Sequence, residues 1–186
     1  RQQYVTYYGG EEGYAKQLEL LRLTDEGLQQ INQVYFLYSE LYKAYCTAGG
    51  ALRPSDEEIA AFAQSGGYCT FLPLYWSITG DEATDAATLA QAQEAAARLR
   101  SAEDVTAAYL QIAQELALQA SETGETAAVQ DLDSSVAAVL TALAEGQVSD
   151  VVTTAKGHYV FVGQALNADA VLDKMFNAKL DAMRES

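Results

Sequence analysis

Residues 140–162 carry, in one short run, the signals of a helix end, a turn and two strands. Leu140 and Leu143 keep helical spacing, and Gly146 stands where such a helix would stop. β-Branched residues follow Gly146, and a Lys-Gly pair then predicts a second turn. Aromatic residues alternate with valine over the rest of the run, as in a half-buried strand. This run favours a mixed fold over a purely helical bundle.

Capping signals place two helices in the first third of the chain. Thr24 is suited to cap the N-terminus of a helix over about 25–46. Ser55 and Glu58 match a capping box, in which each side chain bonds the backbone of the other residue. A helix is therefore predicted over 55–65.

A strand is predicted over 68–79, where aromatic and β-branched residues dominate. Pro73 lies inside this strand and cannot donate a backbone hydrogen bond, which indicates an edge position or a bulge. The other predicted elements are helices over 83–99, 101–116, 134–143 and 167–184, and a short strand over 127–132. Together these elements predict an α+β fold.

The charge of the chain limits its partners. Among 186 residues, 26 are acidic and 11 are basic, for a net charge of −15. Nucleic acid and anionic membrane surfaces are not expected as partners, because both need clusters of Lys and Arg. Solubility alone explains such a charge, and basic client proteins would also be weakly attracted. No apolar run approaches a membrane span, so membrane association is expected only through an anchor outside this sequence.

We expect no metal or other cofactor. The two cysteines, Cys46 and Cys69, form no C-x-x-C pair, and His158 is the single histidine. Zinc sites need more Cys and His ligands than this. Cys46 and Cys69 either join in an oxidising compartment or remain two buried thiols.

Three segments and their order resemble parvulin-type peptidyl-prolyl cis-trans isomerases. The segments are DAATLAQAQEAAARLRS, SAEDVTAAYLQIAQELA and VAAVLTALAEGQVSDVV. The order predicted over 68–166, which is strand, helix, helix, short strand, helix, strand, strand, matches as well. The stretch YYGGEEGYAKQLELLRLTDEGLQQINQVYFLYSELYKAY is similar to the helical chaperone part of extracytoplasmic foldases, namely the PrsA-type lipoproteins and the SurA-type periplasmic chaperones.

The resemblance implies a parvulin-like (FKBP-like) small antiparallel sheet with surrounding helices, plus a helical chaperone domain built from both ends of the chain. Residues 1–54 would form the N-terminal helical segment. Residues 55–166 would form the parvulin-like domain, led by the helix at 55–65. Residues 167–186 would form a C-terminal helix that packs back on the N-terminal helices.

The resemblance also implies a function. The chain would be a bacterial, extracytoplasmic folding factor, secreted or held at the cell surface as a lipoprotein. It would bind unfolded or proline-containing client polypeptides, with weak or lost isomerase activity. Two alternatives stay open: an active peptidyl-prolyl isomerase, and a non-catalytic adaptor that binds other proteins.

The expected catalytic positions do not carry the family's residues. Family members have two facing histidines, whose positions here correspond to Trp76 and Tyr159. His158 stands one residue early, and strand alternation points it to the opposite face, although it is the one candidate catalytic residue. The family's Asp or Cys falls near Leu118 and Gln119, which provide neither group.

Candidate substrate-binding residues come from two parts of the chain. In the isomerase-like part they are Trp76, Tyr159, Val136 and Leu140. The aromatic pair either forms a peptide-binding face or fills the volume that the histidines left. In the helix over 25–46, a tyrosine-rich stripe is either a packed core face or a wall that holds unfolded peptide; its candidates are Tyr35, Tyr38 and Tyr42.

Overall fold

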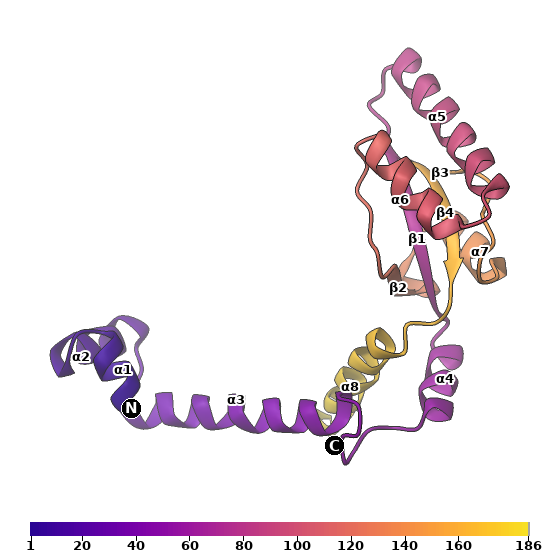
Figure 1. Cartoon of the computed structure of the whole chain (residues 1–186). Coiled ribbons are helices and arrows are strands. Elements are labelled where there is room, and N and C mark those ends of the chain that lie inside the picture. The colour runs from indigo at the N-terminus through magenta and orange to yellow at the C-terminus, as the bar shows by residue number, and fades with distance from the viewer. Residues whose placement is uncertain (186) are drawn as a thin grey trace. The chain divides into compact units, whose positions relative to one another are not determined.

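The computed structural model describes residues 1–185, which fold as two compact units (Figure 1). The first unit is residues 1–54 and the second begins at Ser55. Over the described residues there are eight α-helices and one four-stranded antiparallel sheet. The predicted fold class, α+β with a small antiparallel sheet, is confirmed. None of the described helices is both long and apolar enough to span a membrane.

The first unit contains three helices, α1 (Gln2–Tyr7), α2 (Glu11–Leu21) and α3 (Asp25–Cys46). The Thr24 hydroxyl accepts a hydrogen bond from the Gly27 amide, which is the predicted N-cap. Around this cap, polar groups tie the three helices together. The Arg1 guanidinium forms ion pairs with Glu11 and Asp25, and the buried Tyr14 hydroxyl donates to Asp25.

The second unit is built around a sheet with strand order β2-β1-β4-β3. Strands β1 (Tyr68–Ser77) and β4 (Gly157–Gln164) form its centre, and β2 (Glu125–Ala128) and β3 (Val152–Thr153) lie at its edges. The pairing of β1 with β4 runs from Thr70 opposite Gln164 to Ser77 opposite Gly157. This register decides which side chains share each face of the sheet.

Pro73 lies where one side of β1 has no strand partner. Strand β2 pairs only with Tyr68–Phe71, so the β1 backbone beyond Phe71 is a local edge on that side. The prediction of an edge position is thereby explained, although β1 itself is a central strand. The short strand predicted over 127–132 is shifted, since β2 ends at Ala128 and a 3₁₀ turn, η1 (Val129–Asp131), follows.

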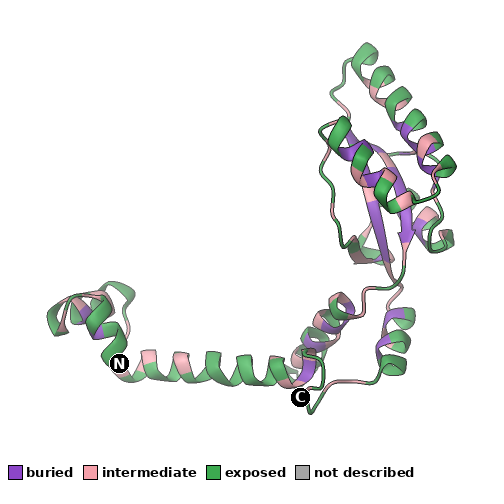
Figure 2. Ribbon diagram, in the orientation of Figure 1, coloured by how far each residue is buried: buried purple, intermediate pink, exposed green. Residues whose placement is uncertain are grey.

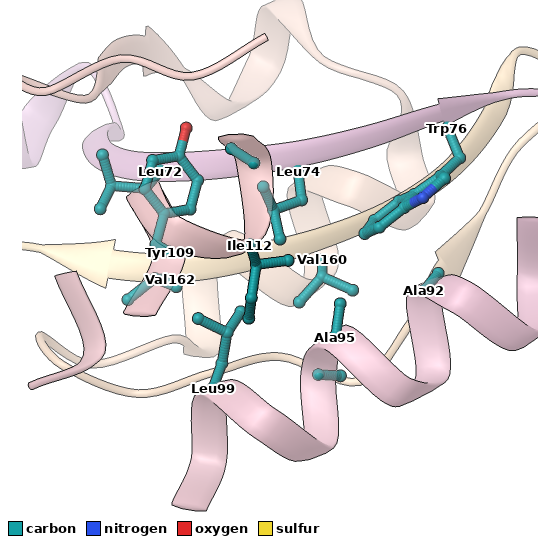
Figure 3. Packing of buried hydrophobic residues seen from close by; sticks show 12 residues of the cluster. Leu72, Leu74, Trp76, Ala92, Ala95, Leu99, Tyr109, Ile112, Val160 and Val162 are labelled. Carbon is teal, nitrogen blue, oxygen red and sulfur yellow. The ribbon is translucent and has the colours of Figure 1, made fainter. Parts of the chain in front are cut away.

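Helices cover the two faces of the sheet. Helices α5 (Glu82–Ser101) and α6 (Val105–Glu115) pack on one face, and α7 (Ser134–Ala142) packs on the other. The main core lies under α5 and α6 (Figure 3). Small residues on α5 let this helix approach the strands closely. The buried residues of this core are Leu72, Leu74, Trp76, Ala92, Ala95, Ala96, Leu99, Tyr109, Ile112, Ala113, Val160 and Val162.

Two further helices of the second unit pack against each other. They are α4 (Asp56–Ser65) and α8 (Ala168–Arg184). The predicted capping box of α4 is present, with Ser55 and Glu58 each bonding the other's backbone. Helix α8 buries Val171, Leu172 and Phe176. Helix α8 thus packs on α4, and the packing of residues 167–186 on the N-terminal helices stays a prediction.

Leu74 tests the main core. Its side chain is fully buried between β4 and the α5–α6 layer, so Leu74→Ala leaves a cavity. We expect the free energy of unfolding to fall by about 2–5 kcal/mol, measured by urea denaturation. The control is Leu166→Ala, at a side chain that is 37% exposed, which should change stability far less. Equal losses in the two variants would contradict this packing.

Candidate functional site

An open groove of about 1080 Å³ lies on the second unit, on the sheet face that α7 partly covers. Strands β1 and β4 form its floor. Its walls are the segment 117–121 after α6, the segment 131–136 that leads into α7, and the turn 154–156 before β4. This volume is at the upper end of the range for ligand sites in proteins.

Four aromatic rings line the floor of the groove, and we call them the aromatic ladder: Phe71, Tyr75, Tyr159 and Phe161. The ring centres of Tyr75 and Tyr159 are 4.8 Å apart, and those of Tyr159 and Phe161 are 5.7 Å apart and nearly parallel. Phe71 meets Phe161 edge to face at 5.5 Å. The ladder arises because alternate residues of a strand share one face and the register sets Tyr75 opposite Tyr159.

The tyrosines of the ladder are only partly covered. Tyr75 is 40% exposed, and its hydroxyl donates to the Lys156 carbonyl at 2.8 Å. Partial burial, followed by the neighbouring Tyr75 phenol, raises the pKa of Tyr159, while a hydrogen bond with Thr154 opposes the shift. These rings therefore offer apolar faces with polar edges, a surface suited to packing against a peptide.

Tyr109 on α6 holds one wall of the groove in place. Its hydroxyl donates to the Pro73 carbonyl and accepts from the Ser121 amide, both at 3.2 Å. The Pro73 carbonyl is within reach because β2 no longer pairs with β1 there. Burial raises the pKa of Tyr109, with the Ser121 amide acting in the opposite direction. A single hydroxyl thus joins the sheet to the segment that follows α6.

Carboxylates stand around the groove. Glu125 on β2, Asp131 in η1 and Asp133 at the start of α7 all line it, together with one cation, Lys156. Asp133 caps α7 by accepting from the Ser135 hydroxyl and amide, and these bonds hold the pKa of its carboxyl below the usual range. Asp131 is exposed and stands beside it in the same wall.

The structure separates the two residues expected to replace the family's histidines. Tyr159 belongs to the ladder, but Trp76 points to the other face of the sheet, where it is 3% exposed in the main core (Figure 3). The residue opposite Tyr159 is Tyr75, one position earlier. The facing pair is therefore Tyr75 with Tyr159 and not the expected Trp76 with Tyr159, because side chains on a strand change face at every residue.

His158 lies on the core face of the sheet, directly opposite Trp76 in the pairing of β1 with β4. Its Nδ1 forms a 2.9 Å hydrogen bond with the Thr153 hydroxyl, and the side chain is 4% exposed. Among the described residues, neither its Nε2 nor the Trp76 Nε1 has a hydrogen-bond partner. His158 lies away from the groove, as the alternation predicted, and cannot act on a ligand bound there.

The other candidate residues fall in three places. Val136 on α7 lines the groove. Leu140, one turn later, is buried behind it among Phe71, Val152 and Phe161. The three tyrosines of α3 belong to the first unit, where Tyr38 and Tyr42 stack at 6.4 Å and Tyr35 is 70% exposed. The sheet brings Val136 and Tyr159 together in one site.

Sequence reasoning missed several groove residues, and two signals could have found them. Counting by two from Tyr159 gives Phe161, and applying the same alternation to the pairing strand gives Tyr75, Pro73 and Phe71. The dipeptide Asp131-Leu132 also marks the wall that α7 continues. Tyr109 could not be found in this way, because its role depends on the fold of the segment after α6.

No group of three or more His, Cys, Asp or Glu side chains in the described part of the chain is arranged to hold a metal ion. Comparison with protein-family models, with curated proteins and with solved structures found no match to this chain.

The Tyr109 hydroxyl gives a test by pH. Because its folded pKa is raised, the neutral phenol contributes stability that is complete below the unfolded value of about 10 and is lost as pH rises through the folded value. The free energy of unfolding of Tyr109→Phe should be about 1 kcal/mol lower at neutral pH, because both hydrogen bonds of the hydroxyl are lost. Above about pH 10 it should fall less steeply with pH than that of the parent. Urea unfolding at neutral and alkaline pH measures both.

The matched control for this test is Tyr7→Phe, at a ring that is 80% exposed. It should leave both the neutral stability and the alkaline slope unchanged. An unchanged alkaline slope in Tyr109→Phe would contradict the assignment of the buried hydroxyl.

Proposed function

We propose that this protein is an extracytoplasmic folding factor that holds extended segments of unfolded client polypeptides in the groove, on a parvulin-like scaffold whose isomerase activity is weak or lost. The aromatic ladder is the observation that carries the proposal. Aromatic residues dominate many protein interfaces because they bury much area at a small entropic cost. The extracytoplasmic location rests on the sequence resemblance alone.

The order of elements in the second unit supports the parvulin-like scaffold. From β1 it runs through α5, α6, β2, α7, β3 and β4, which is the order expected from the resemblance. The groove lies over β1 and β4, the two strands from which the family's histidines would project. At the facing positions this chain has Tyr75 and Tyr159. The chain would thus keep the family's ligand-binding position, with two phenol rings in place of the two imidazoles.

The polar groups of the groove argue for binding over isomerisation. Rotation about an X-Pro bond has a barrier of roughly 18–20 kcal/mol, and a catalyst must favour the twisted amide over the planar one. The Tyr75 hydroxyl is engaged with the Lys156 carbonyl, and the Tyr109 hydroxyl is engaged with Pro73 and Ser121. The single histidine is in the core. What remains for a ligand is the partly exposed Tyr75–Tyr159 ring pair and the carboxylates of the walls.

Helix α3 provides a second surface for clients. No charged residue occurs between positions 27 and 39. The exposed run 34–38 covers every side of the helix, since one turn takes 3.6 residues (Figure 2). Exposed apolar patches of this kind mark interaction sites. Its exposed large apolar residues are Ile31, Val34, Tyr35, Phe36, Leu37, Tyr38 and Leu41.

Removing two ladder rings tests the groove. The double variant Tyr75→Ala, Tyr159→Ala should bind a labelled peptide rich in phenylalanine and proline at least about tenfold more weakly, because interface rings carry much of the binding energy. Fluorescence anisotropy on the full chain measures the affinity, and circular dichroism checks the fold. Leu166→Ala, outside the groove, is the control. Unchanged affinity in the double variant would sink the proposed site.

A protease-coupled assay on a proline tetrapeptide separates folding factor from isomerase. We expect the spontaneous rate with or without the protein. Catalysis at family-like rates that is lost in Tyr159→Phe and kept in His158→Phe would instead establish an active isomerase built on the ladder. Tight binding of one folded partner, without binding of unfolded clients, would favour the adaptor function.

The α3 surface is tested by light scattering of reduced lysozyme as it aggregates. The variant Tyr35→Ser, Phe36→Ser removes two rings that are 70% and 62% exposed, and it should suppress aggregation less than the parent chain. Groove peptide affinity should stay the same. Gln30→Ser, on the same exposed helix, is the matched control. Full suppression by the double variant would restrict client binding to the groove.

A further inference from the structure

The negative charge of the protein is concentrated in the unit that carries the groove. Residues 1–54 contain six acidic and five basic residues, which gives a net charge of −1. Residues 55–186 contain 20 acidic and six basic residues, which gives −14 of the total −15. Solubility would be served equally well by an even distribution, so this asymmetry calls for a local explanation.

The same asymmetry is present in the walls of the groove. The segment 117–136, which supplies two of those walls, contains four acidic residues and no basic one: Glu122, Glu125, Asp131 and Asp133. Three of them line the groove, against the single cation Lys156. The lining therefore carries a formal charge of −2. Carboxylates beside a partly enclosed apolar surface act through a lower dielectric than in open water, so their field is strengthened there.

One end of the groove combines a carboxylate with exposed rings. Asp133 in the segment before α7 and Lys156 in the turn before β4 line the groove together with Tyr75 and Tyr159. The Lys156 carbonyl also accepts a hydrogen bond from the Tyr75 hydroxyl. The Tyr75–Tyr159 ring pair, Asp133 and Lys156 are thus neighbours, and Asp131 stands in the same wall.

We propose that this end of the groove is a subsite for an arginine or lysine side chain of the bound polypeptide, whose cation lies on the Tyr75–Tyr159 rings beside Asp131 and Asp133. The inference rests on the proposed function and gives it a substrate class, extended segments in which basic residues alternate with apolar ones. Cation–π contact and a carboxylate partner reinforce each other at such a place, and arginine satisfies both because its plane stacks while its edge donates.

The chain carries a competitor for this subsite. Among the described residues that line the groove, Lys156 is the one cation, and its backbone carbonyl holds the Tyr75 hydroxyl at this end. A basic client residue must therefore share the carboxylates with Lys156 or displace its ammonium. Removing the Lys156 charge should therefore strengthen the binding of a basic peptide, whereas removing an acidic residue should weaken it. A general disturbance of the fold would weaken binding in both cases.

The experiment uses the full chain and two labelled peptides, one alternating phenylalanine with arginine and a twin with glutamine in place of each arginine. The parent should prefer the arginine peptide, and raising the salt from low to high concentration should reduce that preference. The double variant Asp131→Asn, Asp133→Asn, in which an asparagine at position 133 can still cap α7, should bind the arginine peptide about three- to tenfold more weakly. Lys156→Gln should bind it about two- to fivefold more tightly. The glutamine peptide should bind all variants alike.

The control variant is Glu94→Gln, Glu103→Gln, which removes the same charge from exposed positions outside the groove. It should keep the parental preference, which separates a local subsite from the overall charge. Equal binding of the two peptides by the parent would overturn the subsite while leaving the folding-factor function intact. Failure of both peptides to bind would overturn the function itself. An equal loss in the control and groove variants would also overturn the subsite.

Discussion

The antiparallel pairing of β1 with β4 is the constraint on which the rest of the second unit depends. It sets Tyr75 opposite Tyr159 on the groove face and Trp76 opposite His158 on the core face. A slip of one residue would exchange the two faces and bury the ladder under α5 and α6. Gly157 helps to hold the register, because a side chain there would collide with the Trp76 carbonyl. The core and the groove are thus two results of one pairing.

The groove differs from a catalytic centre because its tyrosine hydroxyls at Tyr75 and Tyr109 are already hydrogen-bonded to the protein backbone. Hydroxyls that could stabilise a developing charge are engaged with backbone groups of the walls, as at Tyr109, and this contact keeps the groove open and shaped. The Tyr75 and Tyr159 rings remain partly exposed, while Phe71 and Phe161 are buried, and carboxylates line the same groove. Under the proposed function, such a surface would bind a chain that brings apolar area and positive charge, and it offers little to a reaction that needs proton transfer. Under the same proposal, the exposed apolar residues of α3 would provide a second binding surface in the first unit.

Much of the local structure could be predicted because it depends on neighbours in sequence. The caps at Thr24 and Ser55 form as the residue pattern indicated, since each involves a side chain and a backbone amide a few residues away. The position of His158 on the face opposite Tyr159 followed from alternation within one strand. The expectation that Trp76 faces Tyr159 depended on the offset between two distant strands, and there an error of one residue put the Trp76 side chain on the wrong face.

By itself, the sequence determined the α+β composition, the helix starts, the acidic balance and the position of His158 on the strand face opposite Tyr159. These are properties of composition and short-range pattern. Tertiary structure alone decided that Tyr75 faces Tyr159, that Tyr109 joins Pro73 to Ser121, and that Asp131 and Asp133 stand beside the rings. Each of these depends on the register of β1 and β4 or on the path of the segment after α6. Contacts between residues tens of positions apart are set by packing of the whole unit, which no local pattern encodes.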